Sequence, residues 1–211
     1  SDCKSLPAGL DRIPNLISLT STALKNVDAL ANCTKLTELD LGECKSLPTG
    51  LDSIPNLISL RIHSWGGWTT GKSAALKNVD ALVNLTNLTS LDLSSDGLQN
   101  VDGLINCSSL TKVDLSNCDS LQNVDSLAKL TKLTSLNLDG CYQLSVSSDD
   151  DELTTRKQVA EYQRKIGVFM ALGGDTNALS NFKDSTSLDL SGSSSLQNVD
   201  GLKDFTKLTE L

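Results

Sequence analysis

Aromatic residues are scarce in this chain, because Phe, Trp and Tyr together make up only 3% of its 211 residues. Compact domains commonly rely on aromatic rings to fill core volume. The core must therefore be built from aliphatic side chains in a regular arrangement. Basic residues are also few, with 18 Lys and Arg against 26 Asp and Glu, which gives a net charge of −8. A nucleic-acid partner would require a basic face, so we expect none.

Other absences narrow the function further. No apolar run approaches the roughly 18 residues of a membrane span. His63 is the only histidine, and no His, Ser or Cys stands at a spacing that would make it catalytic. No general acid–base pair or nucleophile–base pair stands out elsewhere. The sequence therefore indicates no enzyme activity and no cofactor.

The chain does contain a repeat. Its unit has the form L-T-x-L-D-L-S-x-C-x-S-L-Q-N-V-D-G-L-x-x-L-T-K and spans about 23 residues. The clearest copies of its first part are LTELDL at 36–41, LTSLDL at 88–93, LTKVDL at 110–115 and LTSLNL at 133–138. Alternating residues of a strand point to opposite faces, so the leucines face inward. A single coil cannot bury its own apolar face, and neighbouring coils must stack.

This repeat resembles the leucine-rich repeat, in a form close to the internalin-type repeats of bacteria, with Cys often standing where Asn is usual. The resemblance covers nearly the whole chain and implies an α/β fold. That fold is a right-handed solenoid with one short parallel strand per coil on a concave face and turns or 3₁₀ segments on the convex side. We expect one solenoid over residues 1–211, interrupted by a loop insertion at about 63–73 and a helical insertion at about 145–184.

Both ends of the chain fall inside repeats, without a polar cap. Solenoids need capped ends for solubility. We therefore expect this chain to be a segment of a longer array, with further repeats or another subunit at its ends. Because similar repeats occur on bacterial surfaces, a secreted or cell-surface location is slightly favoured over a cytoplasmic one.

An Asn-x-Asp element recurs in five copies of the repeat. We interpret its polar side chains as partners for the turn backbone, a role that suits Asn and Asp. A column of metal sites is the alternative, and it is the weaker one. The copies are Asn26/Asp28, Asn78/Asp80, Asn100/Asp102, Asn123/Asp125 and Asn198/Asp200.

The loop insertion contains GGWTTGKS at 66–73, which matches the pattern of a phosphate-binding loop. Such a loop requires a sustained helix after it and a metal-holding carboxylate on another strand. The next residues are instead AALKNVDAL, the ordinary continuation of the repeat, so we interpret the match as accidental. Trp65 and Trp68 are the only tryptophans. They either form a binding hot spot or fold back over exposed leucines, and both interpretations stay open.

The chain has six cysteines but no C-x-x-C motif. Cys3, Cys44, Cys118 and Cys141 share one repeat position just after the strand, whereas Cys33 and Cys107 stand where other copies have Leu or Phe. We expect buried free thiols. A disulfide between Cys118 and Cys141 on adjacent coils is the geometric alternative.

In the helical insertion, apolar residues recur at helical spacing from Leu153 to Met170. The acidic run before them suits a helix N-terminus, which predicts a helix from about Asp150 to Leu172. Its apolar stripe needs a partner surface. We expect the flank or convex side of the solenoid, with a docked partner or a second subunit as the alternative.

The outward strand positions form columns of Thr, Ser and charged residues. This flat, mildly acidic surface suits a basic partner, and a solvated face without a ligand is the alternative. With the Trp loop it forms the predicted binding site. Its residues are Trp65, Trp68, Glu38, Asp40, Arg61, Asp92, Lys112, Asp114 and Asp189.

We therefore predict a non-enzymatic binding scaffold that recognises a protein, or alternatively a glycan, through the concave face, the Trp loop and the helix. The second hypothesis is a structural segment of a surface assembly that binds nothing specific. Nucleotide binding through the glycine-rich loop is the third and weakest.

Overall fold

The computed structural model describes most of the repeat region and the first part of the helical insertion. The described residues are Leu6, Ile13, 15–22, 24–42, 46–64, 76–144, 152–172 and 206–209. All statements about structure below concern these residues.

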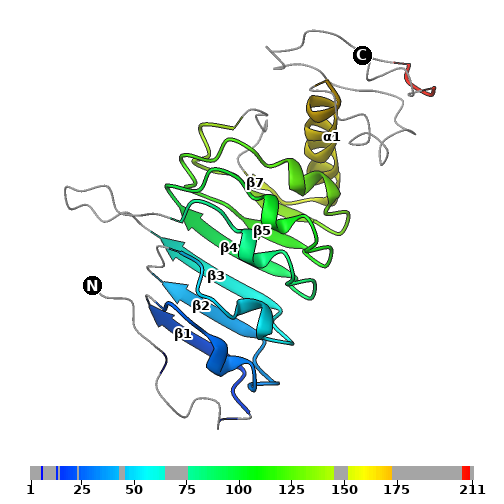
Figure 1. Cartoon of the computed structure of the whole chain (residues 1–211). Coiled ribbons are helices and arrows are strands. Elements are labelled where there is room, and N and C mark those ends of the chain that lie inside the picture. The colour runs from blue at the N-terminus through cyan, green and yellow to red at the C-terminus, as the bar shows by residue number, and fades with distance from the viewer. Residues whose placement is uncertain are drawn as a thin grey trace, which may run out of the picture.

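A single sheet of seven strands runs along the molecule, with the strands in chain order. The strands are β1 (Ser18–Thr22), β2 (Glu38–Gly42), β3 (Ser59–Ser64), β4 (Ser90–Ser95), β5 (Lys112–Asp114), β6 (Ser135–Asn137) and β7 (Glu152–Leu153). From β1 to β6 every pairing is parallel and joins equivalent repeat positions, as in Leu39↔Leu60 and Leu60↔Leu91. Each coil therefore contributes one strand, and the coils stack along the sheet (Figure 1).

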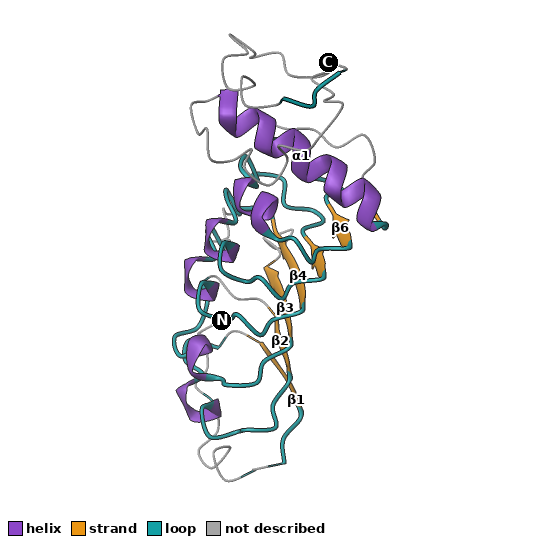
Figure 2. Ribbon diagram, turned by 90° about the vertical axis from the view of Figure 1, so that its right-hand side faces the viewer, coloured by secondary structure: helices purple, strands orange, loops and turns teal. Residues whose placement is uncertain are grey.

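Short 3₁₀ segments occupy the side of the coils opposite the sheet (Figure 2). They are η2 (Asp28–Leu30), η3 (Leu51–Ser53), η4 (Asp80–Leu82), η5 (Asp102–Leu104) and η6 (Asp125–Lys129). The Asn-x-Asp element starts most of them, because the Asn side-chain oxygen accepts a hydrogen bond from the Asp backbone N–H. This distance is 2.8 Å for Asn26 and Asp28, and 2.7 Å for Asn123 and Asp125. The predicted turn role of these residues is confirmed there.

The interior of the stack is aliphatic and continuous. In β2, Leu39 and Leu41 are buried while Glu38 is exposed, as the alternation of a strand requires. Leucines of successive coils join one cluster that extends from Leu24 to Ile166. Full burial of a leucine contributes about 1.5–3 kcal/mol, and each coil obtains it only from its neighbours. The repeat, the strand in each coil and this shared core make the protein a leucine-rich-repeat solenoid.

Four cysteines lie within the described residues, and all are buried free thiols, as predicted: Cys33, Cys107, Cys118 and Cys141. Their thiols link coils to one another. The Sγ of Cys107 donates to the carbonyl oxygen of Leu82 at 3.3 Å, and that of Cys141 to Leu115 at 3.1 Å. Burial raises the pKa of the Cys107 thiol to about 11. Cys3 and Cys44 lie outside the described residues.

The helical insertion begins differently from the prediction. Glu152 and Leu153 form β7, which pairs antiparallel with β6, and the helix α1 spans Arg156–Leu172. The predicted helix start near Asp150 is therefore wrong. Thr155 provides the cap instead. Its hydroxyl accepts from the N–H of Gln158 at 3.3 Å, and the Gln158 side chain accepts from the Thr155 N–H at 3.2 Å, which is a capping box.

Helix α1 lies across the end of the stack, over η6 and β6 (Figure 2). Val159, Tyr162 and Ile166 are buried there and join the leucine core. The apolar stripe thus packs on the solenoid itself, mainly against η6, as the first of the two expectations had it. Within the described part of the chain, no helix has the length and apolar character needed to cross a bilayer.

Candidate functional site

The outer face of the sheet carries a groove of about 350 Å³ that crosses β1 to β5. Strand alternation places every second side chain on this face, and small serines next to long charged residues leave it hollow. Six of the predicted binding residues line the groove: Glu38, Asp40, Arg61, Asp92, Lys112 and Asp114. The structure thus brings together residues that are far apart in the sequence.

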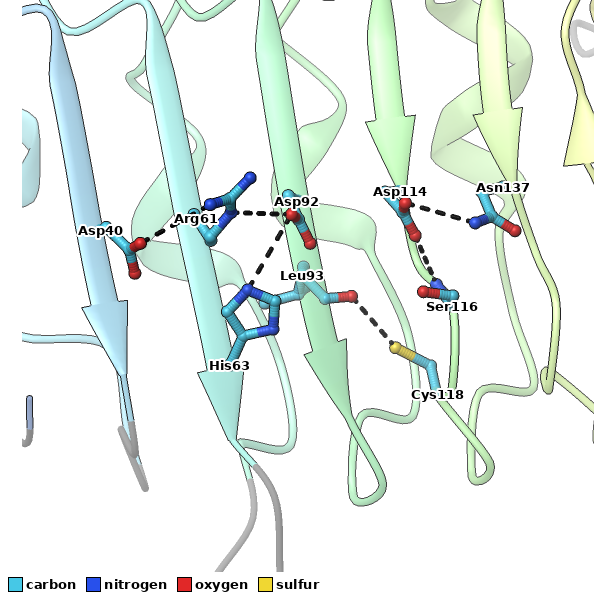
Figure 3. Close-up of polar contacts among 9 residues, drawn as sticks. All are labelled: Asp40, Arg61, His63, Asp92, Leu93, Asp114, Ser116, Cys118 and Asn137. Atoms are coloured by element: carbon cyan, nitrogen blue, oxygen red, sulfur yellow. Dashed lines mark hydrogen bonds and ion pairs between the residues drawn. The ribbon is translucent and has the colours of Figure 1, made fainter.

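Arg61 holds the middle of the groove. It lies in register between Asp40 on β2 and Asp92 on β4. Its Nε donates to Asp92 Oδ2 at 2.9 Å, and its Nη1 lies 3.7 Å from Asp40 Oδ2 (Figure 3). One guanidinium therefore bridges two carboxylates. Their side chains are 55%, 31% and 30% exposed for Arg61, Asp40 and Asp92, so water weakens both pairs.

His63 faces the same cluster. Its Nε2 lies 3.9 Å from Asp92 Oδ2 (Figure 3), so Asp92 stands between an arginine and an imidazole. Both partners leave Asp92 oriented toward β3. This contact is the role that the structure assigns to the only histidine of the chain.

Asp114 is fixed by a different set of partners. Its Oδ1 accepts from the backbone N–H of Ser116 at 2.9 Å, and its Oδ2 accepts from Asn137 Nδ2 at 3.2 Å (Figure 3). Both donors are uncharged, so the carboxylate is held in place while its charge is left uncompensated by them. Asp114 is thus a rigid anionic point at the β5 end of the groove.

Unlike Arg61, Asp40 and Asp92, neither Glu38 nor Lys112 forms an ion pair with any part of the chain that the structure describes. They occupy the same position of their coils, in register through two serines: Glu38↔Ser59, Ser59↔Ser90 and Ser90↔Lys112. The groove therefore has a free carboxylate over β2, a floor of two serines, and a free ammonium over β5.

The threonine column beside this row has a structural role that its sequence pattern alone did not reveal. Each hydroxyl donates to the carbonyl oxygen of the equivalent residue one coil earlier, at 3.0 to 3.4 Å. The donors are Thr37, Thr89, Thr111 and Thr134. Two exposed isoleucines continue the column just before β3 and just before β1, Ile58 at 43% and Ile17 at 59% exposed. The regular spacing of the threonines in the sequence was a visible signal, but it does not identify the acceptors of their hydroxyl groups.

Three predicted site residues, Trp65, Trp68 and Asp189, lie outside the described residues, as does the glycine-rich stretch 66–73. Across the described ranges, no group of three or more His, Cys, Asp or Glu side chains could hold a metal ion. Among the predicted sites, the groove is thus the one whose geometry the described residues define.

No protein-family model and no curated protein matches this chain. Solved structures with a similar fold include two internalins from Listeria monocytogenes. One (inlF) is 17% identical, with 98% of this chain and 63% of that one covered and a TM-score of 0.46. The other (inlC2) is 19% identical, with 100% and 77% covered and a TM-score of 0.49. The Arabidopsis receptor kinase HAESA, solved with a peptide hormone and a co-receptor, is 23% identical, with 64% and 27% covered and a TM-score of 0.39. The chain thus spans less than two thirds of the length of the first of these structures.

Proposed function

We propose that the protein is a non-enzymatic binding scaffold that recognises a protein partner across the outer face of β1 to β5. The observation that carries the proposal is the groove, which gathers charged side chains from successive coils on one face. Charges arranged in this way steer an oppositely charged partner and fix its register. The lining contains four carboxylates and two cationic groups, so the partner presents a predominantly basic surface.

The groove suits binding because its frame is ordered before any partner arrives. The parallel ladder from β1 to β6 fixes the backbone, and Asp92 and Asp114 are held by hydrogen bonds. A preorganised surface loses little conformational entropy on association. The carboxylates of Asp40 and Asp92 are also engaged by Arg61 and are about 30% exposed to water. These features favour recognition over catalysis.

A protein partner is favoured over a glycan. Glycan recognition uses directional hydrogen bonds to sugar hydroxyls, and the threonine hydroxyls already donate their protons to backbone carbonyls. The groups left facing outward along this column are methyl groups and the exposed side chains of Ile17 and Ile58. An apolar edge beside a charged row matches the composition of protein interfaces.

The test is a selection of ligands from a displayed random peptide library. Ser90 lines the centre of the groove, so Ser90→Arg fills it with a long side chain and is expected to abolish binding of the selected ligands. Ser108 is an exposed residue outside the groove, and Ser108→Arg, which makes the same chemical change there, is expected to leave binding unchanged. Ligands that bind both variants equally would refute the proposal. Failure to enrich any ligand would favour the structural, assembly-forming role.

Trp65, Trp68 and Asp189 enter the proposal as further contact residues. Trp side chains contribute strongly to many interfaces, and Trp65 follows directly on β3 in the sequence. The Trp65→Ala/Trp68→Ala variant is expected to weaken binding of a groove ligand that Ser90→Arg abolishes. Equal binding by this variant and the wild type would remove the two tryptophans from the site.

We also propose that the protein is secreted or displayed on the cell surface. The support is the resemblance of its repeat to those of bacterial surface proteins. Protease treatment of intact cells of the source organism is expected to degrade the protein while a cytoplasmic marker survives. Survival of both would contradict this location.

A further inference from the structure

We infer that the groove recognises an extended peptide segment carrying a basic and an acidic residue four positions apart, with the basic residue over β2 and the acidic residue over β5. The inference rests on the proposed function and specifies its ligand. It follows from the unpaired charges of Glu38 and Lys112 and from their spacing. It also follows from the threonine column, in which the exposed isoleucines Ile17 and Ile58 stand near the Glu38 end.

The spacing comes from the register of the sheet. Glu38 on β2 and Lys112 on β5 are separated by three strand-to-strand steps through Ser59 and Ser90. Neighbouring strands lie about 4.8 Å apart, so the Cα atoms of Glu38 and Lys112 are about 14 Å apart across the sheet. An extended peptide rises about 3.4 Å per residue, which covers the same distance in four residues.

Side-chain direction agrees with this spacing. In an extended chain, residues i, i+2 and i+4 lie on the same side. A peptide that runs across the strands therefore presents residues i and i+4 to the groove together, and residue i+2 lies over Ser59 and Ser90 between them. Because these serines form a low, partly buried floor, the middle residue contacts them through a small polar side chain.

The other charged groups of the groove do not compete with a ligand for Glu38 or Lys112. Arg61 is shared between Asp40 and Asp92, and Asp114 accepts from Ser116 and Asn137. Asp114 also lacks an ion-pair partner among the described residues, but it lies two residues along β5 from Lys112, in register with Asp92. Within the row of Glu38, Ser59, Ser90 and Lys112, a ligand therefore meets one anionic and one cationic group without an ion-pair partner among the described residues. Such groups form pairs with a ligand without first breaking pairs of the protein.

The threonine column, with its isoleucines Ile17 and Ile58, favours the same direction of the bound peptide. The exposed isoleucines Ile17 and Ile58 precede the outward residues of the strands on either side of β2, so they flank the Glu38 end. The aliphatic stem of a Lys or Arg side chain packs on such a surface while its charge reaches a carboxylate. At the Lys112 end the column consists of Thr89, Thr111 and Thr134 instead, which suits a shorter acidic side chain.

The experiment compares two synthetic peptides of the same composition. One contains the core KSSSE and the other ESSSK, each flanked by Gly and Ser and with acetylated and amidated ends. Amide chemical shifts of the folded protein are followed during titration with each peptide. KSSSE is expected to bind about five times more tightly, since it forms both ion pairs whereas ESSSK places like charges together. Its shifts are expected to map to the amides around Glu38, Ser59, Ser90 and Lys112.

The matched control exchanges the charges at positions 38 and 112 without changing the net charge of the protein. The variant Glu38→Lys/Lys112→Glu is expected to prefer ESSSK, and the preference of both proteins is expected to shrink as salt screens the charges. Equal binding of the two peptides, an unchanged preference in the swapped variant, or no saturable binding of either peptide would overturn the inference. If ligands selected from the library are blocked by Ser90→Arg but show no charge order, the binding function stands and only this charge code fails.

Discussion

The side-chain amide of Gln163 donates a 2.7 Å hydrogen bond to the carbonyl oxygen of Leu127, which ends the DSL triplet of η6. Two coils earlier, the equivalent carbonyl of Leu82 receives its hydrogen bond from Cys107, a residue of the next coil. At η6 the helix α1 supplies the donor instead. Helix α1 therefore covers the last described coil both with apolar side chains and with a polar group that satisfies its backbone.

Replacement of Gln163 by leucine is expected to destabilise the fold by about 1–3 kcal/mol. The side chain is only 2% exposed and also donates to the Leu130 carbonyl at 2.9 Å. Gln163→Leu would remove both hydrogen bonds, while the two carbonyls keep their backbone donors, the N–H groups of Leu130 and Leu133. Each lost hydrogen bond costs about 0.5–1.5 kcal/mol. Urea unfolding measures the change. Lys157→Ala, at an exposed position of the same helix, is the control and is expected to change stability by less than about 0.5 kcal/mol. An equal effect of both substitutions would show that the hydrogen bonds do not anchor α1.

The start and the anchoring of α1 illustrate the limits of prediction from this sequence. The acidic run before Leu153 suits a helix N-terminus, yet Glu152 and Leu153 pair with β6 because that strand offers an open edge. Gln163 lies four residues after Val159 and three before Ile166, on the apolar stripe. A polar residue in that stripe was a visible signal of a buried hydrogen bond, but its acceptors belong to another part of the chain.

The groove was predictable to the level of residues but not of contacts. Repeat periodicity placed Glu38, Asp40, Arg61, Asp92, Lys112 and Asp114 on one face, and all six line the groove. Which charges pair was not predictable, because Arg61 can reach either neighbour and the outcome depends on its rotamer. The threonine hydroxyls were likewise placed correctly on the face, while their donation to the preceding coil depends on the distance between coils.

Gly103 is expected to be intolerant of alanine, although Ala29 and Ala81 stand at the same place in the η2 and η4 segments. A Cβ at Gly103 would lie 2.0 Å from the carbonyl oxygen of Val79. Because the obstacle is backbone, the coils must separate, and we expect Gly103→Ala to cost about 3 kcal/mol or more. Thermal or urea unfolding measures it.

The control for Gly103 is Ala81→Ser, a change at an exposed position that is expected to alter stability by less than about 0.5 kcal/mol. If Gly103→Ala were as stable as the wild type, η4 and η5 would not pack as closely as the structure has them. The DAL sequence of η2 and η4 alone would suggest that alanine is tolerated at position 103, so this substitution tests whether local packing decides.

Stability is expected to fall in alkaline solution because of the buried thiols. Burial raises the pKa of Cys107 from 9.0 to about 11. Below pH 9 the thiol is protonated in both states and has no effect. Between pH 9 and 11 the unfolded chain loses this proton while the folded chain retains it, so the free energy of unfolding decreases by up to about 1.4 kcal/mol per pH unit.

Cys107→Ser isolates this effect, because a serine hydroxyl can still donate to Leu82 but does not titrate in this range. Urea unfolding at pH 8, 9, 10 and 11 is expected to show a steeper decline for the wild type than for Cys107→Ser. Parallel curves for the two proteins would show that Cys107 ionises as readily in the folded state as in the unfolded chain.

Removal of the bridging guanidinium in the groove is expected to change stability little. Arg61 is half exposed and its pairs with Asp40 and Asp92 face water, so Arg61→Gln should cost about 0–1 kcal/mol in low salt and less at high salt. Part of that cost is repulsion between the two aspartates, and Arg61→Gln/Asp92→Asn should recover it. Urea unfolding of the single and double variants at low and high salt tests this. A loss above about 2 kcal/mol, or one that persists in high salt, would mean that the Asp40–Arg61–Asp92 bridge supports the fold. The small loss expected instead would show that the fold does not depend on the bridge between these three residues.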